Sequence, residues 1–556
     1  MLESTMMDVQ LTIPTILERM KLLFPKSRVV SYLPVGMDPE TKQPIPGRFE
    51  HSYAQVYDRA HQLMNALVGA GVKPGSRVAT FATNHFRHLE LYYAIPSTGA
   101  VAHMVNIRLP DDQIIYIINH AEDEMLFVDN VFLPRLPAIL PHCPTLKRVV
   151  VMGAVPQLPP GMTDYEAFIK DQPSSFAYPD INERQAAGMC YTSGTTGNPK
   201  GVVYSHRAYV LHSLVSVSGE MMGLSEHDTV LPVVPMFHVN AWGYPFTCPF
   251  VGANLVFTSV FTVPGFLAKV LQEEGVTFTA GVPTIWLGLL EELDRAKAAG
   301  MPYRLEKLRS LLVGGSAAPR SLIEAFGERH GLHVIHAWGM TETTPLGTLN
   351  SLKPEHANLE TAARYDQMAL TGRPAMLVEL KLADEHDDPV PHDGKTPGRL
   401  LVRGPWVSGA YYNNPEATAA TTRDGWFDTG DIATINNEGY MLIQDRAKDL
   451  IKSGGEWISS VDLENTLMGH PKLKEAAVIA VPHPKWDERP LGVLVVRDGE
   501  QVEKPELDAF LLERGFAKWQ LPDAYEVVTE IPKTTVGKFL KRALRDQFKG
   551  YTLPGT

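Results

Sequence analysis

Residues 191–202 read Tyr-Thr-Ser-Gly-Thr-Thr-Gly-Asn-Pro-Lys-Gly-Val, and the rest of the chain is organised around this stretch. Glycines let the backbone turn its N–H groups toward an anion, while the hydroxyl groups add donors and Lys200 adds a positive charge. The stretch therefore predicts a loop that holds phosphate groups. It is not a Walker A loop, because that motif needs glycine directly before its lysine, where this chain has Pro199. An ordinary exposed turn is the alternative interpretation.

Length and composition indicate a soluble globular protein of several structural units. The chain has 556 residues, of which 44% are hydrophobic and 21% charged, and its formal net charge is −12. This acidic balance argues against nonspecific binding to nucleic acid or to an anionic membrane, but it is compatible with a local basic pocket for a nucleotide. The three cysteines, Cys143, Cys190 and Cys248, form no CxxC pair, which disfavours zinc ribbons and disulfide scaffolds. The N-terminus lacks the features of a signal peptide, so we expect a cytoplasmic protein.

One segment could be mistaken for a membrane span. Residues 229–268 contain no Asp, Glu, Lys or Arg. Prolines interrupt the segment, and His238 and Asn240 lie within it, which disfavours a spanning helix. We therefore expect buried strands and an apolar wall here, and no transmembrane segment.

The alternation of apolar runs with amphipathic segments predicts an α/β fold. Near Gly372 the pattern changes to short strands separated by turns, which indicates a smaller β-rich subdomain. The clearest boundary lies at Asp445-Arg446-Ala447-Lys448-Asp449. We expect a large N-terminal domain over residues 1–445, made of α/β subdomains and the β-rich subdomain. Residues 446–556 should form a small, mobile α+β domain. Before the boundary, Arg207–Met222 is expected to be one helix.

Three further clusters carry residues suited to nucleotide chemistry. In Trp338–Glu342, a carboxylate beside Thr341 at a strand end could hold Mg²⁺ together with phosphates, although a surface Glu in a turn is the commoner case. In Gly425–Asp431, carboxylates in a glycine turn could accept ribose hydroxyls, although Asp and Gly are also usual in plain β-turns. In Pro532–Lys538, a lysine on a glycine-bearing loop could clamp an anion, although a solvated surface lysine is the plainer interpretation.

Together these motifs resemble the adenylate-forming superfamily, which comprises acyl-CoA synthetases, firefly luciferases and peptide-synthetase adenylation domains. Residues 191–202 match its phosphate loop, 338–342 and 425–431 match its nucleotide motifs, 445–449 match its hinge, and 532–538 match its catalytic-lysine loop. The motifs stand in the family's order. Residues 235–242 and 453–460 look like the branch of bacterial medium- and long-chain fatty acyl-CoA ligases, which also includes 3-methylmercaptopropionyl-CoA ligases.

The resemblance implies two half-reactions: a carboxylic acid and ATP form an acyl-adenylate, and coenzyme A then displaces AMP. It implies ATP, Mg²⁺ and coenzyme A as cofactors and substrates, no nucleic-acid partner, and a homodimer. It also implies a role for each matching residue. The phosphates would be cradled by Thr192, Ser193, Gly194, Thr195, Thr196 and Lys200. Adenine would be enclosed by Gly315, Ser316, Ala317, Trp338 and Gly339, and the ribose would be held by Asp431 and Arg446. Glu342 would ligate Mg²⁺. The catalytic residues would be Thr341, His238 and, above all, Lys538.

The remaining implied roles concern the hinge, coenzyme A and the acyl group. The C-terminal domain would rotate at Lys448 between the half-reactions and bring the loop of Gly455 and Trp457 to the coenzyme A tunnel. The acyl pocket would be lined by Val239, Trp242, Gly243, Gly314 and Met340, with Trp242 at a position that gates the tunnel in a long-chain relative. Core packing is the alternative for Trp242.

The sequence leaves four hypotheses about function. A medium- to long-chain fatty acid is the leading substrate, and a short or sulfur-containing acid such as 3-methylmercaptopropionate is the closest rival. A third hypothesis passes the acyl-adenylate to an acceptor other than coenzyme A, and a fourth is a non-catalytic nucleotide-binding protein. Glu342, Asp431, Arg446 and Lys538 argue against the fourth, and the Ser453–Trp457 loop favours coenzyme A over other acceptors.

Overall fold

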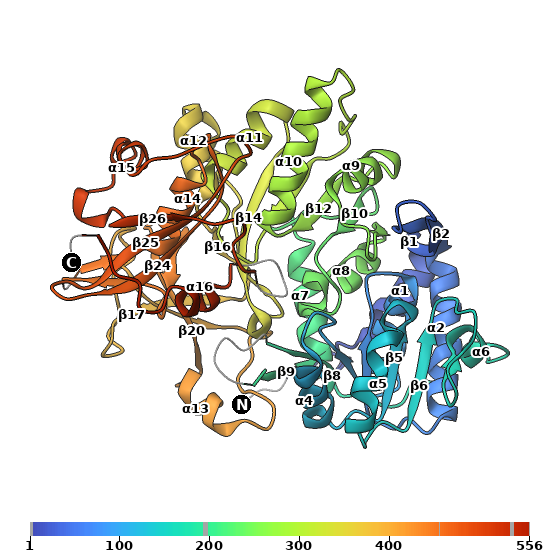
Figure 1. Cartoon of the computed structure of the whole chain (residues 1–556). Helices are drawn as coiled ribbons and strands as arrows, with labels where there is room; N and C mark the ends of the chain where they lie inside the picture. Colours follow the sequence, from blue (N-terminus) through green and yellow to red (C-terminus); the bar gives the residue numbers. More distant parts are fainter. Residues whose placement is uncertain (1–3, 193–197, 455, 534–538, 555–556) are drawn as a thin grey trace.

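The structure is a computed structural model that describes residues 4–192, 198–454, 456–533 and 539–554. Two large sheets, a β-rich subdomain and a small C-terminal domain follow one another along the chain (Figure 1). This is the mixed α/β fold, with a large N-terminal and a smaller C-terminal part, that the sequence predicts.

Two large sheets form most of the N-terminal part. The first has seven strands, in the order β7 (Thr163–Asp164), β6 (Arg148–Met152), β5 (Met125–Asp129), β3 (Arg77–Phe81), β4 (Val101–Met104), β8 (Ala186–Tyr191) and β9 (Gly201–Ser205). The second has nine strands, in the order β16 (Arg373–Pro374), β15 (Leu346–Leu349), β14 (Val334–Gly339), β13 (Ser310–Val313), β12 (Phe278–Gly281), β10 (Thr229–Pro232), β11 (Asn254–Phe257), β1 (Arg28–Met37) and β2 (Pro44–Ser52). Both sheets are parallel through their centres; the nine-stranded sheet ends in antiparallel strands at both edges, and the seven-stranded sheet does so at β9 only.

Helices cover both faces of each sheet, because buried parallel strands are apolar on both sides. The core between the two sheets is filled by α1 (Ile13–Leu23), α2 (Tyr53–Gly69), α3 (Phe86–Ser97), α6 (Tyr165–Ile169), α7 (His206–Ser216) and α8 (Tyr244–Val251). The outer face of the nine-stranded sheet is covered by α9 (Pro264–Glu273), α10 (Pro283–Ala298), α11 (Arg320–His330) and α12 (Thr361–Ala369). The outer face of the other sheet is covered by α4 (Asp111–Ala121) and α5 (Leu136–Ile139).

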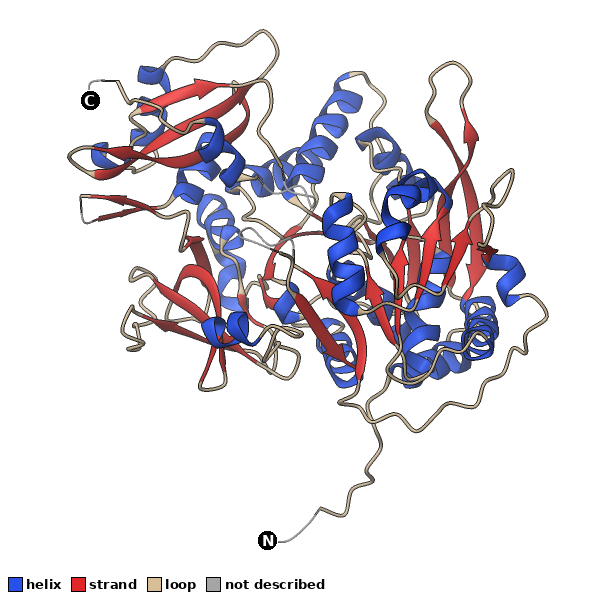
Figure 2. Ribbon diagram, turned by 60° about the horizontal axis from the view of Figure 1, so that its bottom comes forward, coloured by secondary structure: helices blue, strands red, loops and turns tan. Residues whose placement is uncertain are grey.

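Two smaller sheets complete the chain (Figure 2). The β-rich subdomain contains β17 (Glu379–Ala383), β18 (Gly398–Arg403), β19 (Thr422–Arg423), β20 (Trp426–Ile435) and β21 (Met441–Arg446), with α13 (Pro415–Thr421) beside them. The C-terminal domain contains β22 (Ile451–Ser453), β23 (Glu456–Ile458), β24 (Leu473–His483), β25 (Asp487–Val496) and β26 (Ala524–Val527), with α14 (Ser460–Leu467), α15 (Lys504–Glu513) and α16 (Lys541–Gln547). It has apolar clusters of its own. A domain boundary between residues 445 and 446 stays a prediction.

Local sequence signals explain most element ends, and one expected helix is shorter than predicted. In α2 the N-cap is a capping box, since the side chain of Ser52 accepts from the N–H of Gln55 and the side chain of Gln55 accepts from the N–H of Ser52. The helix expected over Arg207–Met222 ends at Ser216. The segment Ser216-Val217-Ser218-Gly219 turns instead, and the N–H of Met222 bonds back to the carbonyl of Ser216. Serine and glycine compete poorly as helix interior residues, which explains the early end.

The charge-free segment is buried, as expected, and contains the short apolar helix α8 between strands β10 and β11. Within the described part of the chain, no helix is long and apolar enough to cross a membrane.

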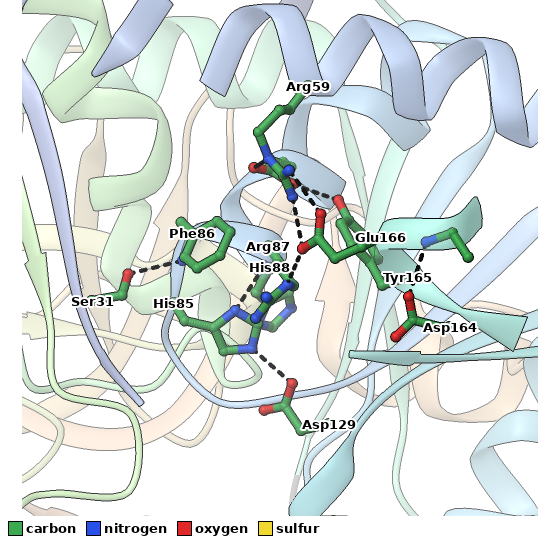
Figure 3. Close-up of polar contacts among 12 residues, drawn as sticks. Ser31, Arg59, His85, Phe86, Arg87, His88, Asp129, Asp164, Tyr165 and Glu166 are labelled. Atoms are coloured by element: carbon green, nitrogen blue, oxygen red, sulfur yellow. Dashed lines mark hydrogen bonds and ion pairs between the residues drawn. The ribbon is translucent and has the colours of Figure 1, made fainter. Parts of the chain in front are cut away.

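A network of charged side chains around the buried Glu90 joins α2 and α3 to α6 (Figure 3). The guanidinium of Arg59 bonds to the carboxylate of Glu90 at 2.6 Å, and Glu90 also accepts from the hydroxyl of Tyr165 at 2.6 Å. Glu166 joins Arg59 to Arg87 at 2.9 and 2.8 Å. Every buried carboxylate of this network therefore has a cationic or hydroxyl partner, which is what burial of charge requires.

A second polar cluster lies beside the first (Figure 3) and holds the turn after β3. Asp129, at the end of β5, accepts from the N–H of Thr83 at 2.8 Å and from the ring of His85 at 2.7 Å. These bonds fix the turn that carries Asn84, the residue between them.

Candidate active site

One cavity of about 750 Å³ lies at the ends of β13 and β14 and extends to the β-rich subdomain and the C-terminal domain. It brings together most of the residues that the sequence singled out: Thr192, Lys200, His238, Val239, Trp242, Gly314, Gly315, Ser316, Ala317, Trp338, Gly339, Met340, Thr341, Glu342, Asp431, Arg446 and Lys448. Gly243 and Trp457 do not line it. Ser193, Gly194, Thr195, Thr196, Gly455 and Lys538 lie outside the described residues.

The stem of the glycine loop is closed by two residues. The N–H of Thr192 bonds to the carbonyl of Lys200 at 2.9 Å, and the N–H of Lys200 lies 3.3 Å from the Thr192 hydroxyl. The ammonium of Lys200 stands 4.8 Å from the ring centre of Tyr411, within the range of a cation–π interaction. The antiparallel pair β8–β9 thus holds both ends of the loop at the cavity.

Glu342 is buried at the cavity wall, with 5% of its surface exposed. Its Oε1 accepts from the hydroxyl of Tyr411 at 2.5 Å, and its carbonyl accepts from the N–H of Ser408 at 2.7 Å. Burial raises the pKa of this carboxyl group, and the Tyr411 bond opposes that effect. A buried carboxylate at a cavity is what the sequence expectation of a Mg²⁺ ligand requires. The surface position, which was the commoner alternative, is excluded.

The residues around Glu342 fit a magnesium ion that also binds phosphates. Among the described residues, no group of three or more His, Cys, Asp or Glu side chains could hold a metal by itself. Mg²⁺ is usually held by one or two carboxylates and by the phosphates of its substrate, rather than by a protein cage. A single carboxylate at a cavity that also contains Lys200 suits this arrangement.

Asp431 is held between a tryptophan and an arginine. Its Oδ2 accepts from the indole N–H of Trp338 at 2.9 Å, and its Oδ1 pairs with the Nε of Arg446 at 2.9 Å. Asp431 and Arg446 are direct partners of the antiparallel pair β20–β21, so the sheet register sets the ion pair. This carboxylate is oriented before any ligand arrives.

Gly339 allows a close approach that no other residue permits. A Cβ atom at this position would lie 1.9 Å from the carbonyl oxygen of Pro345. The pairing of β14 with β15 shifts register between Trp338 and Gly339. The glycine therefore lets the backbone turn directly after the tryptophan that orients Asp431.

The apolar end of the cavity is built on an unusual turn. Residues 239–242 all have positive φ values, from 45° to 56°. Such left-handed backbone costs about 1–2 kcal/mol per residue, so its surroundings must enforce it. Asn240, which is fully buried, accepts from the hydroxyl of Tyr209 at 3.2 Å, and the N–H of Ala241 bonds to the carbonyl of Pro235 at 3.1 Å. The turn places Val239 and Trp242 on the cavity wall.

Trp242 packs against Gly314, which directly follows strand β13. A Cβ atom at Gly314 would lie 3.1 Å from Cη2 of Trp242. The apolar wall is completed by Met222, Pro283, Thr284, Leu287 and Leu312. The indole therefore lies at the cavity surface rather than in the closed core, which favours the pocket interpretation of this residue.

Asn84 is a positioning residue that the sequence analysis missed. Its side-chain amide donates to the carbonyls of Pro232 and Val234, at 3.2 and 2.8 Å, and its oxygen accepts from the N–H of Met236 at 2.6 Å. These bonds fix the segment that leads to His238. A polar residue directly after the buried strand β3 was the available signal, because polar side chains at such strand ends often serve a site.

The C-terminal domain supplies one wall of the cavity. Phe539 and Leu540, the first described residues after the loop of Lys538, line it, and so does Lys448. Burial lowers the pKa of Lys448. Trp457 lies away from the cavity with 47% of its surface exposed. The described part of this loop is flanked by a second tryptophan, since a Cβ atom at Gly454 would lie 2.8 Å from the ring of Trp486.

Family models match two parts of the chain. Residues 37–412 match the AMP-binding enzyme family, and residues 462–538 match the C-terminal domain of AMP-binding enzymes.

Relatives with assigned activities cover nearly the whole chain. A long-chain-fatty-acid–CoA ligase of Thermus thermophilus is 52% identical, over 99% of this chain and 97% of its own length. A 3-methylmercaptopropionyl-CoA ligase of Ruegeria pomeroyi is 47% identical, over 90% of this chain and 92% of its own. A medium-chain-fatty-acid–CoA ligase of Ectopseudomonas oleovorans is 44% identical, over 89% and 90%. The resemblance to this branch of acyl-CoA synthetases is confirmed.

A solved structure supports the same assignment. The anthranilate CoA ligase AuaEII, in complex with anthranoyl-AMP, superimposes with a TM-score of 0.86 at 27% identity, covering 98% of both chains. The matches to the family models, the relatives and this structure agree, and the chain belongs to the AMP-binding enzyme family.

Proposed function

We propose that this enzyme ligates a medium- to long-chain fatty acid to coenzyme A, at the expense of ATP and with AMP as product. The observation that carries the proposal is the two-ended cavity. One end has an oriented carboxylate, Asp431, next to Trp338, which suits a nucleoside. The other end is apolar around Trp242, which suits an acyl chain. Thr341 and Glu342 line the same cavity.

In the first half-reaction a carboxylate oxygen of the acid attacks the α-phosphorus of ATP. The bond from this phosphorus to the bridging oxygen breaks, and pyrophosphate leaves with the electron pair. Thr192, Lys200 and the glycine loop would hold the leaving pyrophosphate, and Thr341 would contact the α-phosphate. Lys538 would neutralise the charge that develops between the acid and the phosphorus, which is where preorganised cations lower a barrier most. His238 would lie beside the reacting carboxyl group.

Magnesium, when bound, would neutralise phosphate charge beside Glu342. Glu342 itself has a defined orientation, because the Tyr411 hydroxyl holds one of its oxygens. Asp431 would accept the ribose hydroxyls, and Arg446 would hold it in place.

In the second half-reaction the sulfur of coenzyme A attacks the acyl carbon. The bond from this carbon to the phosphate oxygen breaks, AMP leaves, and the thiol proton is lost. We propose that the C-terminal domain rotates at Lys448 for this step, so that Lys538 leaves and Gly455 and Trp457 approach. The exposed indole of Trp457, with the ammonium of Lys452 at 4.9 Å from its ring, offers an aromatic and cationic surface for the cofactor. Trp486 extends that surface.

A second candidate substrate is 3-methylmercaptopropionate or another short acid. The relative that carries this activity in its name is almost as similar as the long-chain enzyme. One methylene changes specificity only modestly, so the two substrate classes need a direct comparison.

The test is a coupled assay of AMP release over a panel of straight-chain acids and 3-methylmercaptopropionate, with and without coenzyme A. The proposal expects the highest kcat/KM for medium and long chains, and turnover that requires coenzyme A. A maximum at 3-methylmercaptopropionate would select the second candidate. Turnover without coenzyme A would point to another acceptor, and no AMP with any acid would contradict both.

We also propose that the enzyme is a homodimer and that it works in the cytoplasm. Sedimentation at micromolar concentration tests the first proposal, and cell fractionation tests the second.

A further inference from the structure

A chain of buried polar side chains crosses the hinge. Asp445 stands in β21, just before the hinge residue Lys448, whereas Ser460 and Glu464 belong to α14 and Lys541 begins α16. Asp445 and Ser460 are 1% and 0% exposed, Glu464 is buried, and only 10% of the Lys541 side chain is accessible. Four polar groups from both sides of the hinge are thus removed from water together.

The contacts form one connected sequence from Lys541 to Asp445. The ammonium of Lys541 donates to the hydroxyl of Ser460 at 2.5 Å and pairs with Oε1 of Glu464 at 2.9 Å. The hydroxyl of Ser460 in turn donates to Oδ2 of Asp445, which also accepts from the N–H of Ser460 at 2.7 Å. Glu464 is held within its own domain, since the same oxygen accepts from the N–H of Val478 at 2.7 Å.

These contacts depend on the orientation of the C-terminal domain. Asp445 is fixed to the β-rich subdomain by the pairing of β21 with β20, in which it is the partner of Ile432. Ser460 and Lys541 are fixed to the C-terminal domain through α14 and α16, which pack against β24. A rotation at Lys448 moves the second group relative to the first. It would separate Oδ2 of Asp445 from both of its Ser460 donors and leave the carboxylate with the N–H of Arg446 at Oδ1, and the loss of hydrogen bonds to a charged group is costly.

The same contacts also fix the far end of the catalytic-lysine loop. Lys541 follows Lys538 by three residues, and Phe539 and Leu540 between them face the cavity. An anchored Lys541 therefore determines where the chain leaves the loop. Burial raises the pKa of Asp445, while Lys541 and Ser460 favour its ionised form.

We propose that Asp445, Ser460 and Lys541 are positioning residues that latch the C-terminal domain in the orientation for adenylate formation, and that this latch opens before thioester formation. The proposal rests on the proposed function, because it assigns the two orientations to its two half-reactions. None of the three residues needs to touch the substrates. They act by stabilising one of two domain orientations, and thereby set the balance between the two steps.

Asp449 provides a matched control. It lies four residues after Asp445, on the other side of Lys448, and it pairs with Arg545 of α16 at 2.6 Å. Its partner belongs to the same domain, so a rotation at Lys448 leaves this pair intact. Asp445→Asn and Asp449→Asn thus remove the same charge near the same helix, but only the first removes a contact across the hinge.

The first measurement is of domain orientation. Cys143, Cys190 and Cys248 are buried, so Lys73→Cys and Glu513→Cys, at exposed positions in the two domains, can carry a fluorophore pair. Asp445→Asn and Ser460→Ala should each shift energy transfer in the unliganded protein away from the wild-type value. Asp449→Asn should leave it unchanged, and Lys541→Arg should retain it better than Lys541→Met.

The second measurement separates the half-reactions. In Asp445→Asn, acid-dependent exchange of pyrophosphate into ATP should fall about tenfold, the size expected when one charge-assisted hydrogen bond no longer favours an orientation. Thioester formation from supplied acyl-adenylate should be equal to wild type or faster. Equal loss of both steps, or energy transfer equal to wild type in both Asp445→Asn and Ser460→Ala, would overturn the latch. If wild type forms no adenylate with any acid, the proposed function fails, and the energy-transfer experiment still decides the latch.

Discussion

The two walls of the cavity are held in different ways. On the wall formed by the N-terminal part, Asp431 is oriented by Arg446 on the neighbouring strand and by Trp338 of the nine-stranded sheet, and Gly339 makes the turn after Trp338 possible. On the wall formed by the C-terminal domain, Phe539 and Leu540 line the cavity, and Ser460 of the same domain bonds to Asp445 across the proposed hinge.

The two walls differ in whether their contacts depend on the orientation of the C-terminal domain. We call the wall formed by the N-terminal part the permanent wall and the wall formed by the C-terminal domain the exchangeable wall. In the proposed rotation of the C-terminal domain, contacts set by strand register would persist in both orientations and serve both half-reactions. Contacts across the proposed hinge would exist in one orientation only and serve one half-reaction. A substitution on the permanent wall should therefore slow both half-reactions, whereas a substitution on the exchangeable wall should slow one.

The largest effect is expected from Lys538→Ala. Lys538 lies outside the described residues, and its proposed role is to stabilise charge only during adenylate formation. We expect pyrophosphate exchange to fall by about 10²–10³-fold, the usual loss for a preorganised group of this kind, with thioester formation from supplied adenylate nearly unchanged. Rapid-quench assays of each step measure this. Equal losses in both steps would place Lys538 on the permanent wall.

Trp338→Phe tests the permanent wall. It removes the N–H that holds Asp431 and keeps an aromatic ring. Loss of a hydrogen bond to a charged group is worth about 1.5–3 kcal/mol, so we expect KM for ATP to rise by at least about tenfold. The KM for supplied acyl-adenylate should rise in parallel. Trp426→Phe, at a tryptophan of β20 that does not line the cavity, is the control. A rise for ATP alone would contradict a shared nucleotide site.

Trp242→Ala tests the apolar end. The indole stands on the cavity wall against Gly314, so its removal should deepen the pocket and shift preference toward longer chains by several-fold in kcat/KM. Gly314→Ala should place a methyl group against the same indole, narrow the pocket and shift preference toward shorter chains. The measurement is kcat/KM from C4 to C16. An unchanged profile in both variants would make Trp242 a packing residue.

The smallest effect concerns pH and compares the stability of the two domains. In the N-terminal part, burial lowers the pKa of His206 and His336 to about 4 and that of His212 to about 3. Between pH 6.5 and 4 the unfolded chain binds protons at these positions and the folded chain does not. Stability is then lost as pH falls, by up to about 1.4 kcal/mol per pH unit for each group.

The C-terminal domain should respond in the opposite direction at one position. Burial raises the pKa of Glu464 to about 7, above its unfolded value of 4.5. This contribution to stability is complete below pH 4.5 and is lost as pH rises through 7. Calorimetry from pH 7 to 4.5 should show the N-terminal transition moving down further than the C-terminal one, and Glu464→Gln should reduce the difference. Transitions that move together in both proteins would contradict this assignment.

Sequence alone singled out polar residues that line one cavity in the structure, while their roles stay predictions. Asp431, Arg446 and Glu342 stand in short motifs whose chemistry is local, and the fold brings them to one cavity. It also predicted the strand and helix alternation, because buried strands and amphipathic helices have distinct periods. The roles of the loop residues 193–197 and of Lys538 stay predictions.

What the sequence could not predict depends on distant partners. Nothing near Asn84 reveals that it holds Met236, and nothing near Asp445 reveals that Ser460 donates to it and in turn accepts from Lys541. The left-handed turn at residues 239–242 runs against the preference of its residue types and exists because tertiary contacts impose it. The helix predicted over Arg207–Met222 was wrong for a different reason. Helix α7 ends at Ser216, and the serines and glycine that end it are visible in the local sequence.

The contact of Gly314 with Trp242 has a consequence for how such enzymes diversify. Gly314 contacts the indole at the apolar end, and the next residue in the chain, Gly315, belongs to the set expected around adenine. A single added methyl group at Gly314 would meet the edge of a side chain that lines a cavity rather than a closed core. The same methyl group would lie 3.2 Å from the carbonyl oxygen of Ala337, so a change in acid preference at this position is coupled to the backbone of the strand that leads to the nucleotide end.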